Sequence, residues 1–571
     1  MDSIIFLVLR RMRTPLLVLI VVYAVAIAGL VLIPGRNPDG SAWHLSFFHA
    51  FYFVSYMSTT IGFGELPREF SDAQRIWVTL SIYTTVTAWL YSVGSIIALL
   101  QDKALRRAIE ERRFAYHVSN VKEPFYLVCG FGQTGSGLVR ALTDRNQRAV
   151  VLDNNPERID LLKLEPLLEF VPALRADVRR PNSLLLAGLR SHHCAGVLAL
   201  TSSNEVNLKV ALAAKLMHQD TKVICRADSH DVEANMDSFG TDHIYDPFDI
   251  FARYLKTAID SPCLTSLQDW LGQLRGAMLP EPVYPPAEGL WIICGYGRFG
   301  KALYSHLAER GIELTVVEMT PERTGLPPGP LIKGRGTEAI TLEQADIRRA
   351  VGLVAGTDND TNNLSIIMTA KELNPKLFTV VRENHLMNAD LFKAVNADIL
   401  MHPSLIVAQR IRTLISAPLL TEFVSRAEKE TDAWSCELVS RIVALVHERP
   451  PILWELDVGP TFGYAAKVLA RSGPEPTVGD LLRDPRNRDE MLSAIVLVRK
   501  RATEHQTLPG LEERVLSGDK LLVCGRPGAR DWMQWTLNNP DVLTYVVTGA
   551  RLPRGVLWRW FTQRRTRPQA H

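Results

Sequence analysis

Two long, uncharged apolar runs occur in the first hundred residues, whereas the rest of the chain alternates short apolar and amphipathic stretches. The runs cover residues 16–33 and 76–100. Helices of this length span the ~30 Å hydrocarbon core of a bilayer, so we predict two transmembrane helices. A signal peptide is the alternative for the first run, and it is disfavoured because no small-residue cleavage site follows.

The distribution of basic residues predicts the orientation of these helices. Three arginines precede the first run and five basic residues closely follow the second, but the segment between the runs carries only Arg36, Arg68 and Arg75. Lys and Arg gather on the cytoplasmic side of membrane proteins. We therefore expect a multi-pass protein of the cell (inner) membrane, with both termini cytoplasmic.

The segment between the runs contains a third apolar stretch, residues 43–58, which is too short to cross a membrane. We expect a re-entrant helix here, capped by Ser41. Thr60-Ile61-Gly62-Phe63-Gly64 follows directly, and the second run begins shortly afterwards at Ile76. Alternate glycines allow backbone conformations closed to other residues. Four such strands can turn their carbonyls towards one axis and replace the hydration shell of a cation. A loop with incidental glycines is the alternative.

This order of span, short helix, TxGFG and span resembles the two-transmembrane potassium channel family. The resemblance implies that residues 60–64 are a selectivity filter for K⁺. Phe63 and Glu65 stand where the family usually has Tyr and Asp. Gly94 within the second run is a candidate gating hinge, and a helix-packing position is the alternative.

The chain after residue 124 contains an internal duplication. FYLVCGFGQTGSGLVRAL at 125–142 parallels LWIICGYGRFGKALYSHL at 290–307, so that Gly130 corresponds to Gly295. Further on, a somewhat shorter offset relates Thr201 to Thr357 and Arg226 to Arg382. Each copy alternates apolar strands with amphipathic helices, which predicts a parallel, doubly wound sheet.

Each copy also carries a glycine-rich turn after its first strand, with an acidic residue at the end of the next strand. This context satisfies the fingerprint of a dinucleotide site, in which the glycines admit a diphosphate and the acid binds a ribose. Asp153 or Glu318 would favour NAD or an adenine nucleotide over NADP. Packing of strand on helix, without a ligand, is the alternative. The candidate nucleotide contacts are Gly130, Phe131, Gly132, Gln133, Thr134, Gly135, Asp153 and Asp177 in the first copy and Gly295, Tyr296, Gly297, Arg298, Phe299, Gly300, Glu318 and Thr337 in the second.

The duplicated region resembles RCK domains (regulators of K⁺ conductance), with TSSNEVNL at 201–208 and TDNDTNNL at 357–364 matching the family's helix start. Together with the pore, the chain is similar to prokaryotic two-transmembrane channels with tandem RCK domains, of the GsuK type. The implied fold is an α-helical membrane pore domain followed by two α/β Rossmann-like domains, the second with a small α+β C-terminal subdomain. The expected boundaries are 1–101 for the pore, 102–123 for a helical linker, 124–286 and 287–430 for the RCK domains, 431–550 for the subdomain and 551–571 for a basic tail. Within them we expect helices at 247–260 and 265–279.

The resemblance implies a homotetramer with eight RCK domains in a cytoplasmic gating ring. Nucleotide (NAD, ADP or ATP) would gate passive K⁺ conduction, and Ca²⁺ is a second candidate ligand, with acidic pairs such as Glu110 and Glu111 or Glu428 and Glu430. One alternative is a non-selective cation channel on the same scaffold. Another is a membrane-tethered NAD-dependent oxidoreductase, for which His192, His193 and His243 are the candidate acid–base residues. They form no recognisable constellation, so we expect no enzyme.

Charge and cysteine content indicate which partners and which cellular compartment to expect. The net charge of +3 arises from 64 basic and 61 acidic residues, and no face interleaves basic and aromatic residues, so we expect no nucleic-acid partner. The lipid bilayer is the other expected partner. The seven cysteines are scattered without metal-ligand spacing, and we expect them to be free core residues of a reducing compartment.

Overall fold

The computed structural model describes residues 2–37, 41–64, 68–273, 278–447, 450–469 and 475–550. The chain separates into two compact units. The first contains residues 1–122 with 186–188, and the second contains residues 123–185 and 189–571.

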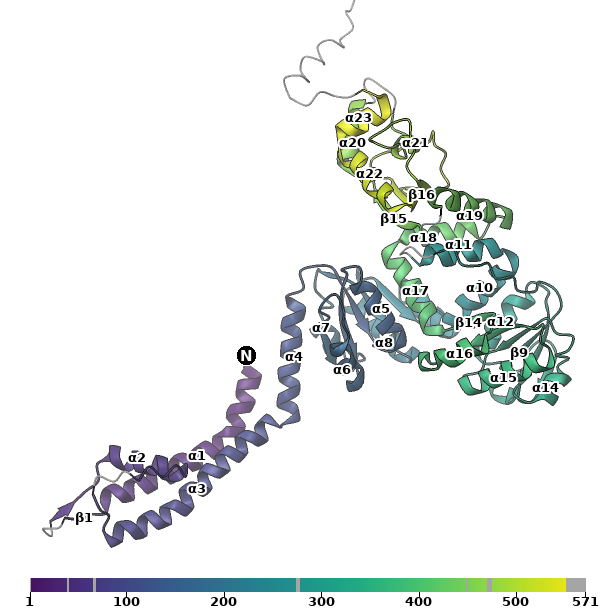
Figure 1. Ribbon diagram of the computed structural model, residues 1–571. Helices are drawn as coiled ribbons and strands as arrows, with labels where there is room; N and C mark the ends of the chain where they lie inside the picture. The colour runs from purple at the N-terminus through teal and green to yellow at the C-terminus, as the bar shows by residue number, and fades with distance from the viewer. Residues whose placement is uncertain are drawn as a thin grey trace, which may run out of the picture. The chain divides into compact units, whose positions relative to one another are not determined.

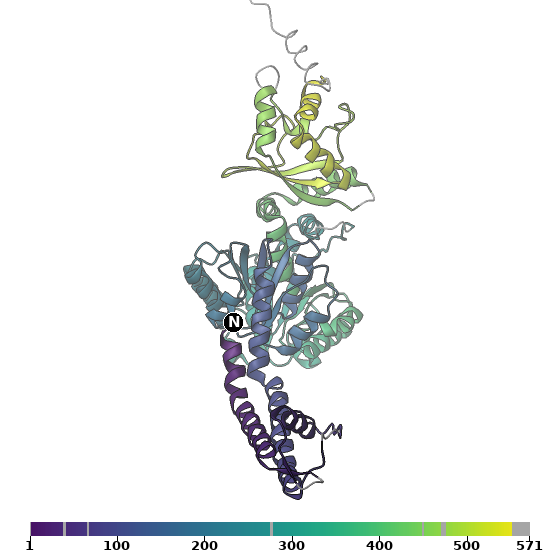
Figure 2. The same cartoon turned by 90° about the vertical axis from the view of Figure 1, so that its left-hand side faces the viewer.

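The first unit is built on two long helices that lie side by side, α1 (Asp2–Leu32) and α3 (Asp72–Leu100) (Figure 1 and Figure 2). Both are long and apolar enough to cross a membrane, as the two apolar runs predict. The shorter helices α2 (Phe47–Ser58) and α4 (Lys103–Ser119) belong to the same unit. Leu30 of α1 and Ala50 and Val54 of α2 are fully buried in one small core.

Specific side chains fix α3 against α1. Gln74 closes a capping box with Ser71 and donates through Nε2 to the Ile33 carbonyl at 3.0 Å, and the Trp77 indole donates to the Ala26 carbonyl at 3.1 Å. Gly29 makes room for that indole, because a Cβ there would lie 2.1 Å from the Trp77 ring. A Cβ at Gly94 would meet nothing within 4 Å in the described chain, so packing within the chain does not require a glycine there.

The start of α2 differs from the prediction. Ser46, not Ser41, is the N-cap, and its hydroxyl accepts from the His49 backbone N–H at 3.4 Å. The preceding residues instead form a two-stranded antiparallel ribbon of β1 (Gly35–Arg36) and β2 (Ala42–Trp43). The apolar run therefore continues through a strand before the helix begins, and hydrophobicity alone does not mark that change.

The second unit contains two six-stranded sheets with the same strand order. The order is β5-β4-β3-β6-β7-β8 in one and β11-β10-β9-β12-β13-β14 in the other, and every pair is parallel. The predicted duplication and doubly wound sheets are thus confirmed. The strands of the first copy are β3 (Phe125–Cys129), β4 (Arg148–Asp153), β5 (Ala173–Arg175), β6 (Cys194–Ala199), β7 (Val223–Arg226) and β8 (His243–Tyr245), and those of the second are β9 (Leu290–Cys294), β10 (Glu313–Glu318), β11 (Leu331–Lys333), β12 (Gly352–Ala355), β13 (Phe378–Arg382) and β14 (Ile399–Met401).

Helices connect these strands and cover both faces, so the central strands are buried almost throughout. The helices of the first copy are α5 (Gln133–Thr143), α6 (Pro156–Leu164), α7 (Pro181–Leu186), α8 (Asn204–Met217) and α9 (His230–Ser238), and those of the second are α12 (Arg298–Ala308), α13 (Pro321–Thr324), α14 (Ala339–Gln344), α15 (Asp360–Leu373), the 3₁₀ turn η1 (Leu386–Asn388) and α16 (Ala389–Val395).

The two copies exchange helices. After its last strand, the first copy contributes α10 (Pro247–Asp260), which packs on α12 of the second copy. In return α17 (Pro403–Ser416) of the second copy packs on α5 of the first (Figure 1). Phe251 and Leu255 are thereby buried with Phe299 in one core, and Val407 and Ile411 with Leu138 in the other. Each lobe is completed by the helix of its neighbour in the chain.

A disulfide contradicts the expectation that every cysteine is free. Cys263 and Cys436 are bonded, with their Cα atoms 5.1 Å apart and a sequence separation of 173. They join α11 (Pro262–Gly272) to α19 (Asp432–Val446), which bury apolar side chains together with α18 (Pro418–Ala427). Helix α10 has its predicted bounds, whereas α11 starts before the predicted residue 265 and ends at Gly272. The other five cysteines are free, as expected.

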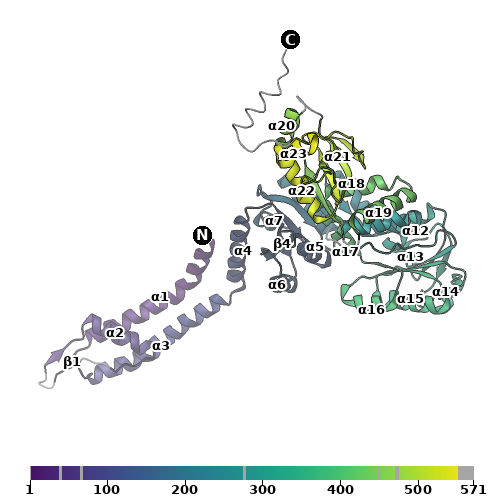
Figure 3. The same cartoon turned by 45° about the horizontal axis from the view of Figure 1, so that its top comes forward.

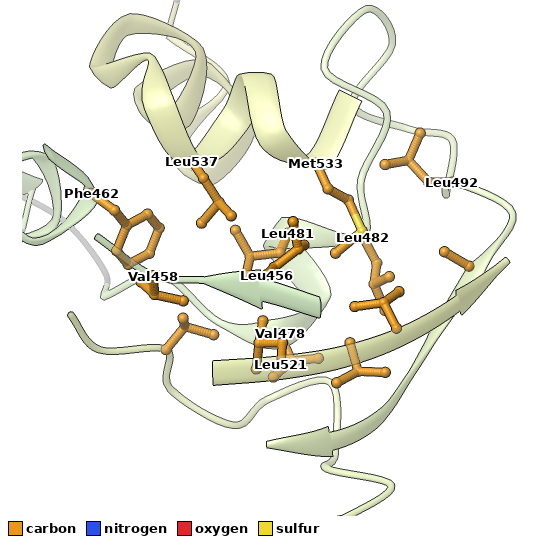
Figure 4. Close-up of a cluster of buried hydrophobic side chains, with 14 of the residues drawn as sticks. Leu456, Val458, Phe462, Val478, Leu481, Leu482, Leu492, Leu521, Met533 and Leu537 are labelled. Atoms are coloured by element: carbon orange, nitrogen blue, oxygen red, sulfur yellow. The ribbon is translucent and has the colours of Figure 1, made fainter. Parts of the chain in front are cut away.

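The C-terminal region is the predicted α+β subdomain. Its antiparallel sheet has the order β15-β18-β16-β17, from β15 (Ile452–Asp457), β16 (Ala494–Arg501), β17 (Glu504–Thr507) and β18 (Lys520–Gly525). One face carries α20 (Pro460–Leu469), the short α21 (Val478–Leu481), and α22 (Pro527–Asn538) beside α23 (Pro540–Thr548) (Figure 3). Leu521 and Leu456 of the sheet meet Leu481, Met533 and Leu537 in one buried cluster (Figure 4). The predicted basic tail and Glu65 lie outside the described residues.

Candidate functional site

The predicted filter strand leaves the C-terminal end of α2 through a tight turn. The N–H groups of Thr60 and Ile61 donate to the carbonyls of Met57 and Tyr56 at 3.1 and 3.0 Å. Thr60, Gly62 and Gly64 then have φ values of 62°, 64° and 73°. Left-handed residues at every second position turn successive carbonyls towards one side, which an ordinary strand does not do.

Neighbouring side chains fix the helix end from which the filter strand starts, whereas the side chains of the strand itself are largely exposed. The hydroxyl groups of Tyr23 in α1 and Ser58 in α2 are hydrogen bonded, and the ring of Phe63 stands edge-on to Tyr56 at 6.1 Å. Ile61 and Phe63 are 60% and 65% exposed in the single chain, and no described residue would crowd a Cβ at Gly62 or Gly64. The C-terminal end of α2 carries the negative end of the helix dipole, which favours a cation.

The acidic residue of each glycine-rich turn is buried and holds that turn in place. Asp153 Oδ2 accepts from the Phe131 N–H at 2.6 Å, and Glu318 Oε2 accepts from the Tyr296 N–H at 2.7 Å. The second oxygen of each carboxylate accepts from a backbone N–H slightly further along the chain, that of Asn155 or Thr320. Because a carboxylate offers about four acceptor positions, each retains capacity for a ribose hydroxyl.

The three glycines of each turn have different roles. A Cβ at Gly135 or Gly300 would lie 2.0 Å from the carbonyl oxygen of the first glycine of its turn. The third glycine therefore permits close packing of helix on strand. The second glycine is open, because a Cβ at Gly132 would have its nearest described neighbour at 3.7 Å and one at Gly297 would meet none of the described residues within 4 Å.

An asparagine bridge recurs in both copies at the strand ends beside the turns. Asn207 accepts from the backbone N–H and hydroxyl of Thr201 at 2.9 and 2.7 Å and donates to the Arg226 carbonyl at 2.9 Å. Asn363 makes the same three bonds to Thr357 and Arg382 at 2.9, 2.7 and 2.8 Å. Both asparagines are fully buried, so the resemblance at 201–208 and 357–364 has a structural basis in this network.

Each turn opens onto a cavity at the carboxyl ends of its strands, the place where open α/β sheets bind ligands. The cavity of the first copy measures about 610 Å³, and that of the second about 660 Å³. The predicted residues that line the first are Gly130, Gly132, Gln133, Thr134, Asp153 and Asp177. Those that line the second are Gly295, Gly297, Arg298, Glu318 and Thr337. Phe131, Gly135, Tyr296, Phe299 and Gly300 line neither, since they are buried beneath the turns.

Four further arginines line the cavities at matched positions of the duplication. Arg158 and Arg323 each lie five positions after the acidic residue of their copy, and Arg179 and Arg335 are related by the shorter offset. Arg158 contacts Asp153 at 3.4 Å, and Arg179 forms an ion pair with Asp177 at 2.9 Å. The pairing keeps the pKa of Asp177 below its usual value. Comparison of the two copies at both offsets would have identified all four arginines.

One contact between the two copies is charged, whereas its counterpart is not. Arg298 in the second turn pairs with Asp228 of the first copy at 2.6 Å, and its guanidinium lies over the ring of Phe248. The equivalent positions, Gln133 and Asn384, are uncharged, and both line the first cavity. The first cavity is thus walled by both copies, whereas an ion pair stands beside the second turn.

Arg382 lines both cavities. It lies over Phe248 of the first copy at 4.8 Å, and burial, reinforced by Arg298, lowers its pKa to about 10. An anion in either cavity would therefore meet a guanidinium that is poorly solvated and already close to a second positive charge.

The other predicted groups lie apart from these cavities. His192, His193 and His243 line neither of them. Among the described residues, the one group of potential metal ligands with atoms close together is Cys263, Asp432 and Cys436, and its two cysteines are bonded to each other; neither acidic pair suggested for Ca²⁺ belongs to such a group.

Comparison with known proteins gives matches over both units. Residues 16–102 match the ion channel family model, and residues 126–247 and 291–403 each match the TrkA-N domain. Potassium channel protein 1 of Methanocaldococcus jannaschii is 27% identical over 24% of this chain and 42% of its own length. The voltage-gated potassium channel Kch of Escherichia coli is 26% identical over 34% of this chain and 44% of its own. The matches thus span less than half of these relatives.

Solved structures that match the chain include the GsuK channel, at 17% identity and a TM-score of 0.47, and the GsuK channel bound to NAD, at 16% and 0.45. Both alignments cover 94% of this chain and all of the other. An ion-channel domain followed by two TrkA-N domains is present in this one chain, with a helical first unit and two Rossmann-like lobes. The chain thus combines a match to the ion channel family with two matches to the TrkA-N domain, and it is similar to prokaryotic potassium channels.

Proposed function

We propose that the chain is the subunit of a K⁺-selective channel whose opening is controlled by a nucleotide bound to its RCK domains. In this proposal four copies bring four strands of residues 60–64 around one axis, with Thr60 at the inner end. Both termini and all eight RCK domains lie on the cytoplasmic side, which agrees with the basic residues that flank the two long helices.

The observation that carries the conduction part is the backbone of the filter strand. Left-handed conformations at Thr60, Gly62 and Gly64 follow directly on the C-terminus of a short apolar helix. Carbonyls turned to one side, in four copies, can replace the hydration shell of K⁺. Irregular backbone of this kind is tolerated at membrane depth where it lines such a pathway.

The observation that carries the regulatory part is the pair of cavities at the glycine-rich turns. Each combines an open second glycine, a buried acidic residue and repeated arginines, which together suit a diphosphate, a ribose and a net negative charge. The first cavity has walls from both copies, so a ligand there would favour one arrangement of the lobes by its differential affinity.

The exchanged helices suggest how the binding of such a ligand affects the pore. Because α10 and α17 each complete the core of the other lobe, a movement of one lobe also moves the helix that it receives from the other. Residues 103–119 form a continuous helix, capped by Asp102, directly after the second membrane-type helix. We propose that this helix transmits the movement, with Gly94 as the hinge in α3.

Single-channel recording of the purified full chain in a planar bilayer tests this proposal. NAD, ADP and ATP are added in turn to the side of the soluble domains, and Ca²⁺ is added separately. We expect at least one nucleotide to change the open probability of a K⁺ current. An open probability that is indifferent to all three nucleotides would refute the regulatory part. A current that does not distinguish K⁺ from Na⁺ would instead indicate a non-selective cation channel.

A further inference from the structure

A third cavity lies between the exchanged helices, away from both nucleotide cavities. Its volume is about 230 Å³, and it shares no lining residue with the other two. Its walls come from α10 and α11 of the first copy, from α17 and α18 that follow the second, and from β14. The cavity is therefore built where the two copies interlock.

Equivalent positions of the duplication face each other across this cavity. Ile250 and Ile406 are related by the shorter offset of the duplication and both line the cavity, as do Tyr254 and Arg410. The two copies differ at the second of these pairs, because the first copy has Tyr254 where the second has Arg410. The remaining walls are mostly apolar, with Phe251, Leu400, Leu420 and Val424 among them.

Two donors at this cavity have no acceptor in the described part of the chain. The Arg410 guanidinium forms no hydrogen bond and no ion pair there, and burial lowers its pKa. The Gln268 Nε2 atom is buried and has no hydrogen-bond partner among the described residues. Since buried polar groups in proteins are nearly always hydrogen bonded, both groups suit an acceptor that enters the cavity.

The acidic group at the cavity is already engaged. Asp269 Oδ2 accepts from the Tyr254 hydroxyl at 2.8 Å, and burial raises the pKa of Asp269. Asp269 and Glu428 act on the guanidinium of Arg410 through space, without a direct ion pair in the described residues. The polar end of the cavity therefore has an excess of donors.

We propose that this cavity binds a small organic anion, a carboxylate on a compact apolar body, with Arg410 and Gln268 donating to the carboxylate. Its volume is below the ~300–1,000 Å³ of pockets for drug-sized ligands, so the ligand is a molecule of about the size of benzoate. Because the walls belong to helices from both copies, the bound ligand holds the interlocked helices together. This binding does not depend on conduction or on nucleotide.

Benzoate is the probe for the test, with benzyl alcohol as its uncharged counterpart of similar shape. Titration calorimetry on the detergent-solubilised full chain should give saturable benzoate binding at millimolar concentrations and at least tenfold weaker binding of benzyl alcohol. Arg410→Gln should weaken benzoate binding at least about tenfold, the loss expected for charge-assisted hydrogen bonds. Arg348→Gln removes an arginine that pairs with Glu343 at 2.9 Å and lines none of the three cavities, so this variant should bind benzoate like the unaltered chain.

A second variant keeps the test decisive if Arg410→Gln does not fold. Ile406→Phe fills the cavity and retains Arg410, and it should also abolish benzoate binding. Equal benzoate affinity in folded Arg410→Gln or Ile406→Phe protein would overturn the proposal. Absence of saturable binding to the unaltered chain would also overturn it and would indicate a cavity filled with water alone.

Discussion

Alanine at the second glycine of each turn separates a ligand role from a packing role. Gly132 and Gly297 have φ values of −81° and −71°, which alanine adopts without strain, and a Cβ would meet no atom closer than 3.7 Å at either position. The methyl group would, however, occupy the surface on which a diphosphate approaches the helix N-terminus. Gly132→Ala and Gly297→Ala should therefore fold normally and bind nucleotide poorly.

The expected magnitudes follow from these contacts. Where the backbone is compatible, replacement of Gly by Ala changes the free energy of unfolding by less than about 1 kcal/mol, usually in the stabilising direction. Displacement of the diphosphate should lower affinity at least tenfold, which corresponds to about 1.4 kcal/mol. The matched controls Gly135→Ala and Gly300→Ala place a Cβ 2.0 Å from a carbonyl oxygen and should destabilise the lobe by about 1–3 kcal/mol.

The assay is titration calorimetry of NAD, ADP and ATP into the solubilised full chain, combined with denaturant unfolding. The single variants show which copy binds, since only the variant in the binding copy loses affinity. If the double variant Gly132→Ala/Gly297→Ala folds and binds nucleotide as tightly as the unaltered chain, the glycines serve packing alone and the reasoning fails.

Three further predictions concern other parts of the molecule. Reduction of the Cys263–Cys436 bond, or Cys436→Ser, should lower the free energy of unfolding of the second unit by about 2–5 kcal/mol, because the bond closes a long loop between residues that are 173 positions apart. A denaturant midpoint that dithiothreitol does not change would contradict this. His402 is buried, and burial lowers its pKa to about 4. The neutral imidazole therefore stabilises the folded state fully above the unfolded pKa of about 6.5, and this stabilisation is lost as pH falls from there towards 4. His402→Asn should remove on the order of 2 kcal/mol of the pH dependence of the free energy of unfolding, and an unchanged pH dependence would argue against this role of His402. Gly29→Ala should lower the thermal stability of the solubilised chain by forcing Trp77 aside, whereas Gly94→Ala should not, because no described residue of the chain lies within 4 Å of its added Cβ. Equal melting temperatures for both variants would refute the packing assigned to Gly29.

Local patterns were sufficient to predict most of the fold. Two apolar runs, a duplicated order of strands and helices and two glycine-rich turns each depend on residues close in sequence. The acidic residue that follows each turn could be predicted in the same way, because it ends the parallel strand that pairs with the strand before the turn. The bounds of α2 were harder to predict, since Ala42 and Trp43 are as apolar as the helix that begins at Phe47.

Features that depend on long-range contacts were missed. Cys263 and Cys436 meet only because α11 and α19 share one core. Arg382 reaches both cavities because the copies interlock through α10 and α17, and no spacing within one copy indicates that arrangement. The cavity beside Arg410 has the same origin. Arg158 and Arg323, in contrast, were recognisable from the duplication alone.

The reversal potential of the purified full chain, with K⁺ on one side of a planar bilayer and Na⁺ on the other, tests the central claim most directly. The account predicts a potential far from zero and close to the K⁺ equilibrium value, and loss of that selectivity in Gly62→Ala, because Gly62 has a φ of 64° that alanine adopts only with strain. A reversal potential near zero in the unaltered chain, or unchanged selectivity in Gly62→Ala, would contradict the assignment of residues 60–64 as a K⁺ filter.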